Sequence, residues 1–556
     1  MKNIVADIIS KKVGLNVLEV EKLIEVPPKD ELGDYAFPCF SLAKKERKNP
    51  LVIAEDLAEK FRRNLPKEIS NVNFNGGYVN FFVDKNVLAK NVLSKVGEKG
   101  FGGNGSGKGK KIVIEFSQPN THKAFHVGHI RGTSLGESLA RIFEFEECKV
   151  IRVNYSGDTG MHIAKWIWGY NKYHSKEKLR NDESWIAGIY VEAVKKIGDS
   201  KKFQGEVEEI NRKIESKEDK GINDLWSKTR KMSIESWGRI YGELNTHFDK
   251  DYFESEFEEE ARKICLDLLK KKIAKKDDAV FMDLKKEGLG VWVILRRDGA
   301  VLYSAKDIAL AKKKVKDFPA DRYLVAVGAE QKLHFEQLKR TLELMKFPRS
   351  KVYDFLTFGM VRFPDGKMSS RTGDNVFYSD FVKKVADSAK EGIKDRSPGA
   401  KNLEERSMKI AVAAIKYSML KQDSKKNIIF DRNQAISFEG DTGPYLLYSY
   451  ARASSIGRKV KSKKAVKIVD LKDVEIRLLK KIDSFPDVVA KAYENLAPNL
   501  IANYCFELSK LFNEFYHSCP VLGSIEEGFR LKLVEAFRIT LGKGMNLLGI
   551  EVLEEM

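Results

Sequence analysis

The sequence predicts an α/β protein built on a doubly wound parallel sheet, with a small α/β domain before the sheet and an all-helical domain after it. Two short apolar, β-branched runs, 112–116 and 323–327, each precede a glycine turn and a helical segment. Strands that alternate with helices are typical of a doubly wound nucleotide-binding sheet. The region after residue 402 shows only helical periodicity.

The N-terminal region is expected to form the small α/β domain over residues 1–97. Helical spacing at 4–9 and 52–61 is combined there with a strand-like run at 78–83. Residues 98–111 are rich in Gly, Ser and Lys, and this composition predicts a flexible linker.

The sheet domain is predicted over residues 112–400. A highly charged, helical insertion interrupts it at about residues 165–275. Residues 401–556 are predicted to form the all-helical domain, in which Pro486 is expected to kink or split one helix.

Composition limits the class of protein and of partner. The 556 residues are 42% hydrophobic and 32% charged, which excludes a chain that is disordered throughout. The 99 basic and 80 acidic residues give a net charge of +19. Such a surplus indicates either a polyanionic partner, with nucleic acid first, or lysines that serve solubility. The basic runs, Lys270–Lys272 and Lys312–Lys314 among them, are spread along the chain, unlike those of a compact DNA-reading module.

The five cysteines have no zinc-ligand spacing and predict neither a disulfide framework nor a metal site. This usage fits a reducing cytoplasm. The N-terminus lacks the apolar run of a signal peptide, and no segment approaches the roughly 20 apolar residues that span a membrane.

The predicted linker contains a near match to a phosphate-binding loop, Gly102-x4-Gly107-Lys108. The motif requires Ser or Thr at the next position, where this chain has Gly109, and no convincing strand precedes it. We therefore do not predict a phosphate site here.

A pair of histidines, His126 and His129, stands at the predicted turn from the first strand to its helix. Two imidazoles three positions apart can face one ligand and donate to phosphate oxygens at a helix N-terminus. Gly128 between them permits close approach of a nucleotide. Metal ligation is the alternative, and it lacks a suitably spaced carboxylate or cysteine.

A second segment, Gly366-Lys367-Met368-Ser369-Ser370, follows another predicted strand. It offers one cation and two hydroxyls that can close over a triphosphate as pyrophosphate leaves. The alternative is an exposed polar turn.

The two segments together resemble the HIGH and KMSKS signatures of class I aminoacyl-tRNA synthetases, and nearly the whole chain resembles arginyl-tRNA synthetases. The similar stretches, in order, are Gly33–Tyr35, Gly77–Phe82, Glu115–His129, Tyr303–Ile308, Gly328–Gln337, Lys367–Arg371 and Ser437–Arg452.

This resemblance implies a Rossmann-like catalytic domain, an N-terminal domain that contacts the tRNA D-loop, and a C-terminal anticodon-binding domain. It implies an arginine–tRNA ligase for protein synthesis. Such an enzyme forms arginyl-adenylate from L-arginine and ATP with Mg²⁺, and then esterifies the terminal adenosine of tRNA(Arg). We expect a cytoplasmic monomer without a membrane partner.

The amino acid is expected to bind through its guanidinium, which needs carboxylates and neutral acceptors in fixed geometry. Tyr303 and Asp307 lie four residues apart, on one face if the segment is helical. By the resemblance, Asp307 and Glu115 read the guanidinium and Tyr303 shapes its pocket. Asn120 and Gln331 hold the α-amino and carboxylate end. The alternative makes Tyr303 a core residue and Asp307 a surface charge.

The resemblance also assigns the ATP site. His126, His129 and Lys367 would stabilise the phosphates. Ser370 stands where the general signature has a second lysine, and our hypothesis is that Lys123 supplies that charge. The further expected ATP contacts are Gly128, Gly328, Glu330, Met360, Val361, Met368 and Ser369.

Contacts with tRNA are expected at both ends of the chain. By the resemblance, Asn75, Tyr78 and Asn80 meet the D-loop. Tyr445 and Tyr516 can stack on unpaired bases, although aromatic residues at helical spacing are more often core.

Three other functions compete with this interpretation. A cysteinyl enzyme of the same class would need zinc-ligating cysteines, which are not suitably placed. A non-enzymatic tRNA-binding relative would not need intact His126, His129 and Lys367. A cofactor-making nucleotidyltransferase would not need the large basic C-terminal domain.

Overall fold

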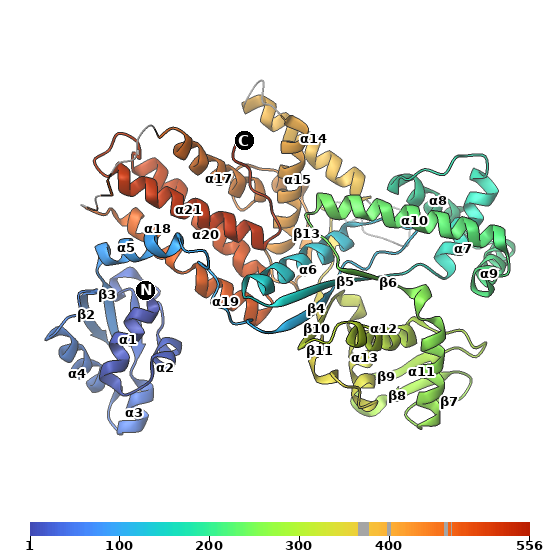
Figure 1. Cartoon of the computed structure of the whole chain (residues 1–556), viewed down its shortest axis with the longest axis horizontal. Helices are drawn as coiled ribbons and strands as arrows, with labels where there is room; N and C mark the ends of the chain where they lie inside the picture. The colour runs from blue at the N-terminus through green and yellow to red at the C-terminus, as the bar shows by residue number, and fades with distance from the viewer. Residues whose placement is uncertain (365–376, 397–401, 461–464, 467, 469) are drawn as a thin grey trace. The chain divides into compact units, whose positions relative to one another are not determined.

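The protein is described by a computed structural model that covers residues 1–364, 377–396, 402–460, 465–466, 468 and 470–556 (Figure 1). The chain forms two compact units. Unit 1 comprises residues 1–102, 452–487 and 507–541, and unit 2 comprises residues 103–451, 488–506 and 542–556.

The centre of unit 2 is a five-stranded parallel sheet, which confirms the predicted fold class. Its strand order is β11-β10-β4-β5-β6. Glu115, the last residue of β4, lies opposite Val325 on one side and Val153 on the other. Since all strands run in one direction, their carboxyl ends meet at one edge, where ligands bind in such sheets. The strands are β4 (Lys111–Glu115), β5 (Lys149–Ser156), β6 (Lys250–Phe253), β10 (Arg322–Gly328) and β11 (Tyr353–Phe358).

Helices cover both faces of this sheet, as Figure 1 shows. On one face, Val113, Val153 and Val325 pack with apolar side chains of α11, α12 and α13. On the other, α6 lies along the strands and packs against α15. The helices are α6 (Val127–Phe145), α11 (Glu258–Lys270), α12 (Tyr303–Asp317), α13 (Lys332–Leu344), α14 (Tyr378–Arg396) and α15 (Leu403–Leu420).

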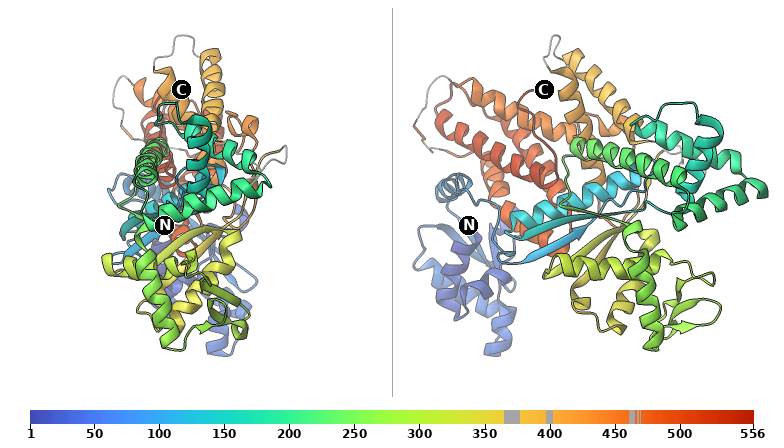
Figure 2. Two further views of the ribbon diagram at one scale, coloured as in Figure 1. Left: turned by 90° about the vertical axis from the view of Figure 1, so that its right-hand side faces the viewer. Right: turned by 45° about the vertical axis from the view of Figure 1, so that its right-hand side comes forward.

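The predicted insertion is a helical cluster with a core of its own, seen in teal and green in Figures 1 and 2. Its last helix ends at Glu243, and the chain then returns to the sheet through β6, which sequence patterns did not reveal because it has only four residues. The elements are α7 (Met161–Gly169), the π-helical turn η2 (Tyr170–His174), α8 (Glu183–Ile197), α9 (Lys201–Ser216) and α10 (Lys220–Glu243).

A small antiparallel sheet follows α11 and was also not predicted. Its outer strand β7 is very short, and β8 alternates buried and partly buried side chains. The strands are β7 (Lys275–Lys276), β8 (Val280–Leu284) and β9 (Gly290–Leu295).

The segment predicted as a linker is tied to the end of α6. Gly107 donates its amide to the carbonyl of Glu146, and the amides of Asn104 and Ser106 donate to the Glu146 carboxylate. A Cβ at Gly107 would lie 2.2 Å from the Cys148 Sγ. These amides are therefore committed to Glu146, and the segment precedes a strand, so it is no phosphate-binding loop.

Unit 1 joins the N-terminal α/β region to helices from late in the sequence. Its antiparallel sheet has the order β1-β3-β2. The Met1 ammonium forms an ion pair with Asp483 at 2.8 Å, and Lys480 forms one with Asp34 at 2.5 Å. The N-terminal elements are α1 (Lys2–Val13), α2 (Val17–Leu23), β1 (Tyr35–Pro38), α3 (Phe40–Glu46), α4 (Pro50–Arg62), β2 (Ile69–Asn75), β3 (Tyr78–Val83) and α5 (Lys85–Val96).

The C-terminal region is helical, as predicted, and the unit boundaries fall within its helices. Pro486 splits the predicted helix as expected, because it occupies the first turn of α19, where its missing amide costs nothing. None of the described helices combines the length and the apolar character that crossing a bilayer requires. The helices are α16 (Arg432–Ala435), α17 (Gly443–Arg458), α18 (Asp473–Asp483), α19 (Phe485–Asn495), α20 (Pro498–Ser518) and α21 (Glu527–Leu547).

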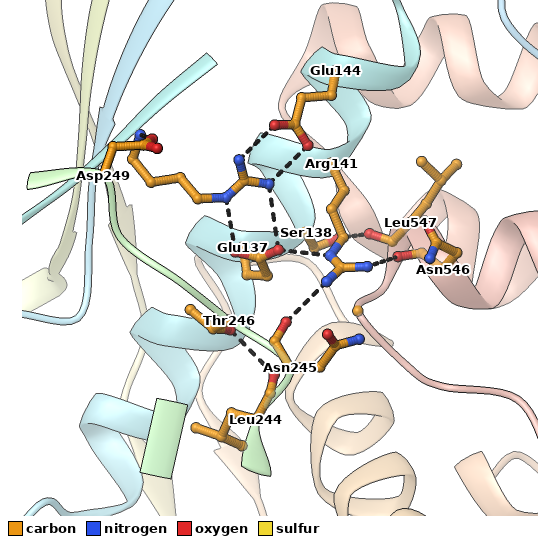
Figure 3. A network of polar contacts seen from close by, with 12 residues as sticks. Glu137, Ser138, Arg141, Glu144, Leu244, Asn245, Thr246, Asp249, Asn546 and Leu547 are labelled. Atoms are coloured by element: carbon orange, nitrogen blue, oxygen red, sulfur yellow. Dashed lines mark hydrogen bonds and ion pairs between the residues drawn. The ribbon is translucent and has the colours of Figure 1, made fainter. Parts of the chain in front are cut away.

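A buried charge network holds the C-terminal half of α6 (Figure 3). Glu137 is fully buried and accepts from Arg141 at 2.6 Å and from Arg152 of β5 at 3.0 Å. Arg152 also binds Glu144. Arg141 donates onward to the carbonyl of Asn546 at 3.2 Å. Each charge thus has opposite charges or carbonyls around it, which offsets the cost of burial.

Candidate active site

The loop from β4 to α6 is held in a conformation that non-glycine residues rarely adopt. Ser117, Gln118 and His122 have φ angles of 80°, 52° and 63°. Gln118 donates its amide to Asn154 Oδ1 at 3.0 Å, and His122 donates its amide to Ser233 Oγ at 3.1 Å. Left-handed conformations of this kind persist where neighbours impose them, and they cluster at functional sites. This loop lies at the carboxyl edge of the sheet.

The two predicted histidines cap α6 with their side chains. Nδ1 of His126 accepts from the amide of Gly128 at 3.1 Å, and Nδ1 of His129 accepts from the amide of His126 at 3.1 Å. This is a reciprocal capping box made of imidazoles, with ring centroids 3.8 Å apart. Because both Nδ1 atoms accept, each neutral ring has its proton on Nε2. The Nε2–H groups are therefore the donors that the pair offers to a ligand.

Both imidazoles are neutral at physiological pH. Burial lowers the pKa of His126 to about 4. Burial and the charges of His126 and Lys123 hold the pKa of His129 well below its ordinary value. Neutral donors at the positive end of a helix suit phosphate oxygens.

Lys123 is a cation at this end of the site, since its charge lowers the pKa values of both His126 and His129. Its Nζ lies 5.6 Å from the centre of the Tyr190 ring. Burial lowers the pKa of Lys123, and the carboxylate of Glu254 acts against this shift. The structure thus brings together the lysine and the two histidines that the sequence singled out.

Glu115, predicted to read a guanidinium, has partners in the protein itself. Its carboxylate is 3% exposed, forms an ion pair with Lys314 of α12, and accepts from Gln118 Nε2 at 2.9 Å. Burial alone would lower the pKa of Lys314, but the charge of Glu115 raises it. In the sequence, Lys314 stands out only as part of a basic run. It lies seven residues after Asp307, two turns along the same face of α12, and this spacing was the available signal.

Asp307 is oriented by a histidine that sequence reasoning missed. His334 of α13 has Nε2 at 2.5 Å from Asp307 Oδ2, and its Nδ1 accepts from Trp292 Nε1 at 3.2 Å. The same ring lies 4.9 Å from the ring of Tyr303. Tyr303 is 60% exposed, which excludes the alternative that it is a core residue.

Four carboxylates converge on one buried phenol at the end of β5. Burial raises the pKa of Tyr155 well above its ordinary value, and the charges of Asp307, Glu254, Glu115 and Asp158 raise it further. The Tyr155 hydroxyl has no hydrogen-bond partner among the described residues. The carboxyl edge of the sheet therefore holds an acidic pocket suited to a cation.

Glu254 is another residue of this pocket that was not predicted. A Cβ added at Gly157 would lie 2.2 Å from Asn120 Oδ1 and 3.4 Å from Glu254 Oε1, so the two side chains meet over this glycine. Burial raises the pKa of Glu254 to about 7; the charge of Lys306 acts against this, and that of Asp307 adds to it. Its position directly after β6 would have been a signal only if that strand had been recognised.

The rim of the site lies at the end of β10. The Glu330 carboxylate folds over Gly328, where a Cβ would meet Glu330 Oε1 at 2.3 Å. Glu330 and Gln331 are exposed. The three residues lie one strand away from Glu115, at the same edge of the sheet.

The two residues of the predicted adenine contact, Met360 and Val361, differ in how their peptide groups are hydrogen-bonded. Met360 donates its amide to Asn427 Oδ1 at 2.8 Å, and its carbonyl accepts from Ile428 at 3.0 Å. β12 (Val361–Arg362) pairs in parallel with β13 (Ile428–Ile429). The Arg362 carbonyl accepts from the amide of Phe430, the residue that follows β13. Met360 and Arg362 thus bond to the β13 side, and in a parallel ladder the N–H and C=O of the residue between them, Val361, point away from the partner strand. Val361 therefore offers one donor and one acceptor side by side.

Lys367, Met368 and Ser369 lie outside the described residues, as does Ser370. Within the described ranges, no three or more His, Cys, Asp or Glu side chains are grouped as a metal site would require.

Two of the three residues predicted to meet the tRNA D-loop lie at a hairpin of unit 1. Asn75 and Tyr78 pair across the turn from β2 to β3; Asn75 is exposed, and the Tyr78 ring packs edge-on against Phe40 with centroids 5.3 Å apart. Asn80 is only 4% exposed, so its side chain has little surface to give to RNA in this conformation.

The two predicted stacking tyrosines differ in surroundings. Tyr516 is 40% exposed, and the guanidinium of Arg452 lies 4.8 Å from its ring centre. Tyr445 is partly buried in the first turn of α17, with its ring 5.8 Å from that of Phe506.

Comparison with known families agrees with this architecture. Residues 90–432 match the model for the catalytic domain of class I tRNA synthetases of the R type, residues 446–556 match the DALR anticodon binding domain, and residues 1–83 match the arginyl tRNA synthetase N-terminal domain. The first match covers more than half of the chain. With the parallel sheet and the imidazole-capped helix, it defines a class I aminoacyl-tRNA synthetase.

Full-length relatives specify the member of this class. The chain is 35% identical to the arginine–tRNA ligase of Clostridium perfringens, with 100% of both chains covered, and 35% identical to that of Halothermothrix orenii, with 100% and 99% covered. It superposes on the Thermus thermophilus arginyl-tRNA synthetase with a TM-score of 0.80, 26% identity and 96% of both chains covered. The chain belongs to the arginyl-tRNA synthetase family. It is therefore an enzyme, an aminoacyl-tRNA ligase that uses ATP.

Proposed function

We propose that unit 2 activates L-arginine with ATP, supplied as its Mg²⁺ complex, and passes it to the terminal adenosine of tRNA(Arg), with release of pyrophosphate and then AMP. The observation that supports this most directly is the pair of neutral Nε2–H donors on His126 and His129. They stand at the same edge of the sheet as the acidic pocket around Asp307. Phosphate donors and a cation pocket side by side suit ATP and a guanidinium amino acid.

In the first step, an arginine carboxylate oxygen attacks the α-phosphorus of ATP. A P–O bond forms there, the bond to the bridging oxygen breaks, and pyrophosphate leaves with the electron pair. His126 and His129 donate hydrogen bonds to the phosphate oxygens, and Lys123 supplies positive charge. Lys367 supplies a second cation, with Met368 and Ser369 beside it. Positioning and charge stabilisation suffice, so no covalent enzyme intermediate forms.

The guanidinium of arginine is bound by Asp307 and by Glu115, beside Tyr303. Glu115 keeps acceptor capacity although Lys314 and Gln118 already use part of it, because a carboxylate has about four lone-pair sites. A lysine substrate would leave acceptors of this pocket unpaired, at a cost of about 1–3 kcal/mol each. The site therefore selects arginine by geometry as well as by charge.

The other groups of the two substrates lie along the same edge. Asn120 and Gln331 hold the α-amino and carboxylate end of arginine. The adenine is read by the backbone of Val361, with Met360 beside it. The remaining contacts of the adenosine are proposed at Gly128, Gly328 and Glu330.

In the second step, a ribose hydroxyl of the terminal adenosine attacks the carbonyl of arginyl-adenylate, and AMP leaves. Asn75 and Tyr78 are proposed to contact the tRNA D-loop, and Tyr445 and Tyr516 to stack on unpaired bases. The functional domains are residues 1–97, 112–400 and 401–556, with 98–111 as linker. The enzyme is proposed to act in the cytoplasm as a monomer.

Arginine-dependent ATP–pyrophosphate exchange tests the proposal. Exchange is measured with and without tRNA, and with lysine and cysteine in place of arginine. We expect label to enter ATP with arginine and not with the other two amino acids. Exchange that depends on another amino acid and not on arginine would contradict the proposal.

A further inference from the structure

Arg131, in the second turn of α6, is a buried cation whose acceptors are four backbone carbonyls. The side chain is 1% exposed. Nη1 donates to the carbonyls of Gly359 at 2.6 Å and Met360 at 3.3 Å. Nη2 donates to those of Ser424 at 2.9 Å and Lys426 at 2.7 Å. One guanidinium thus joins α6 to two segments that are far apart in the sequence.

These two segments are also held closely to each other. Gly359 donates its amide to the carbonyl of Ser424 at 2.9 Å, and a Cβ at Gly359 would lie 2.5 Å from the carbonyl of Lys426. On the helix side, a Cβ at Gly132 would lie 3.0 Å from the Phe358 ring. Only glycines permit this close approach, so Arg131 acts on a junction with little freedom to shift.

The position of Arg131 links the two ends of the proposed nucleotide site. It follows His129 by two residues on the same helix, so α6 fixes the spacing between the Nε2–H donors of the histidines and the guanidinium. Met360, whose carbonyl it holds, immediately precedes Val361. The distance between the phosphate donors and the base-reading edge of Val361 is thus set by this side chain.

We propose that Arg131 is a positioning residue for ATP, which holds the Gly359–Met360 backbone at a fixed distance from the phosphate end of α6. This inference rests on the proposed function. Arg131 does not touch the nucleotide, and it acts through the peptide groups that it binds. A planar fork can span four acceptors, whereas a lysine ammonium is a single point that cannot reach both segments equally.

The test compares Arg131→Lys with Arg141→Lys in ATP–pyrophosphate exchange with tRNA present. Arg141 is the matched control, because it lies on the same helix and also donates to backbone carbonyls, those of Asn546 and Asn245. We expect Arg131→Lys to raise the KM for ATP at least about tenfold and to weaken discrimination against GTP, with the KM for arginine within about twofold of the parent. Arg141→Lys should leave the KM for ATP, the discrimination against GTP and the KM for arginine unchanged.

A second variant approaches the same peptide from its other side. Asn427→Ala removes the acceptor for the Met360 amide, and we expect it to raise the KM for ATP several-fold in the same direction. Arg131→Lys or Asn427→Ala with an unchanged KM for ATP would overturn the inference, even if the melting temperature falls. If the parent enzyme itself shows no arginine-dependent exchange, the proposed function fails instead.

Discussion

The histidine pair that caps helix α6 and the charge network in the C-terminal half of this helix use polar groups in opposite ways. At the N-terminal end, His126 and His129 are neutral, bind backbone amides through Nδ1, and leave their Nε2–H groups for a ligand. In the C-terminal half, Glu137 is charged and buried, and it pairs with the buried Arg152 of β5. The histidine pair thus offers hydrogen-bond donors to a ligand, whereas the charges around Glu137 are paired within the protein and hold the fold. Stability and activity should therefore respond separately to changes in the histidine pair and in the charge network.

The largest effect on stability is expected from Glu137→Gln. The change leaves two guanidiniums, Arg141 and Arg152, without their shared carboxylate in a buried place. We expect a loss of about 3–5 kcal/mol in the free energy of unfolding. All six tryptophans lie in unit 2, so tryptophan fluorescence during urea unfolding reports on that unit alone.

Glu144→Gln is the matched control, since Glu144 binds the same arginine but is 44% exposed. The Glu144→Gln variant should lose less than about 1 kcal/mol in the free energy of unfolding. The exchange rate per folded molecule should be that of the parent for both variants. Equal stability losses for the two would contradict the network's proposed role.

At the other end, His129→Ala should reduce the rate of ATP–pyrophosphate exchange by about 100- to 1000-fold, because one phosphate donor is removed. Saturation kinetics with varied arginine provide the control. The KM for arginine should change little, because the imidazole is assigned to the phosphates. A parent-like exchange rate would show that His129 serves only as a cap.

Lys123→Ala should reduce the adenylation rate by about tenfold, because a cation beside the phosphates is lost. Lys165→Ala is the control, since Lys165 is a neighbouring cation whose charge lowers the pKa of Lys123. Single-turnover formation of arginyl-adenylate measures both. An unchanged rate in Lys123→Ala would refute the hypothesis that this residue replaces the second signature lysine.

A smaller, pH-dependent effect is expected at Glu254, whose pKa is raised to about 7 by burial. Below pH 7 its carboxyl group is neutral, and above pH 7 it adds a negative charge to the acidic pocket. Because arginine is a cation, its KM should fall between pH 6 and pH 8, by at most about tenfold. Glu254→Gln should flatten this dependence, and a profile that keeps its slope in this variant would count against the assignment.

Sequence reasoning found the parts of the site that lie within single motifs. The strand-to-helix turn at 112–145 and the spacing of His126 and His129 could be predicted because both depend on local sequence. The cation pocket was found only in part. His334, Glu254 and Lys314 become site residues through helices and strands that meet in the fold, and no local pattern reports such meetings.

The same reason explains what was missed in the fold. β6 has four residues and β7 has two, and strands this short show no recognisable alternation of apolar and polar residues. The division of the C-terminal helices between two units depends on long-range packing, such as the ion pair of Met1 with Asp483. The burial of Arg131 was not predicted either, because its four carbonyl partners lie more than 200 residues away in the sequence.

The most direct test of the division within α6 is the substitution His126→Asn, measured by exchange and by thermal unfolding together. Asparagine is a preferred N-cap and can accept from the Gly128 amide as the imidazole does, but it has no Nε2–H to reach a phosphate. The account predicts a melting temperature within about 2 °C of the parent. It also predicts an exchange rate at least about 100-fold lower. A variant that keeps the exchange rate of the parent would contradict the claim that this end of α6 is built to bind ATP.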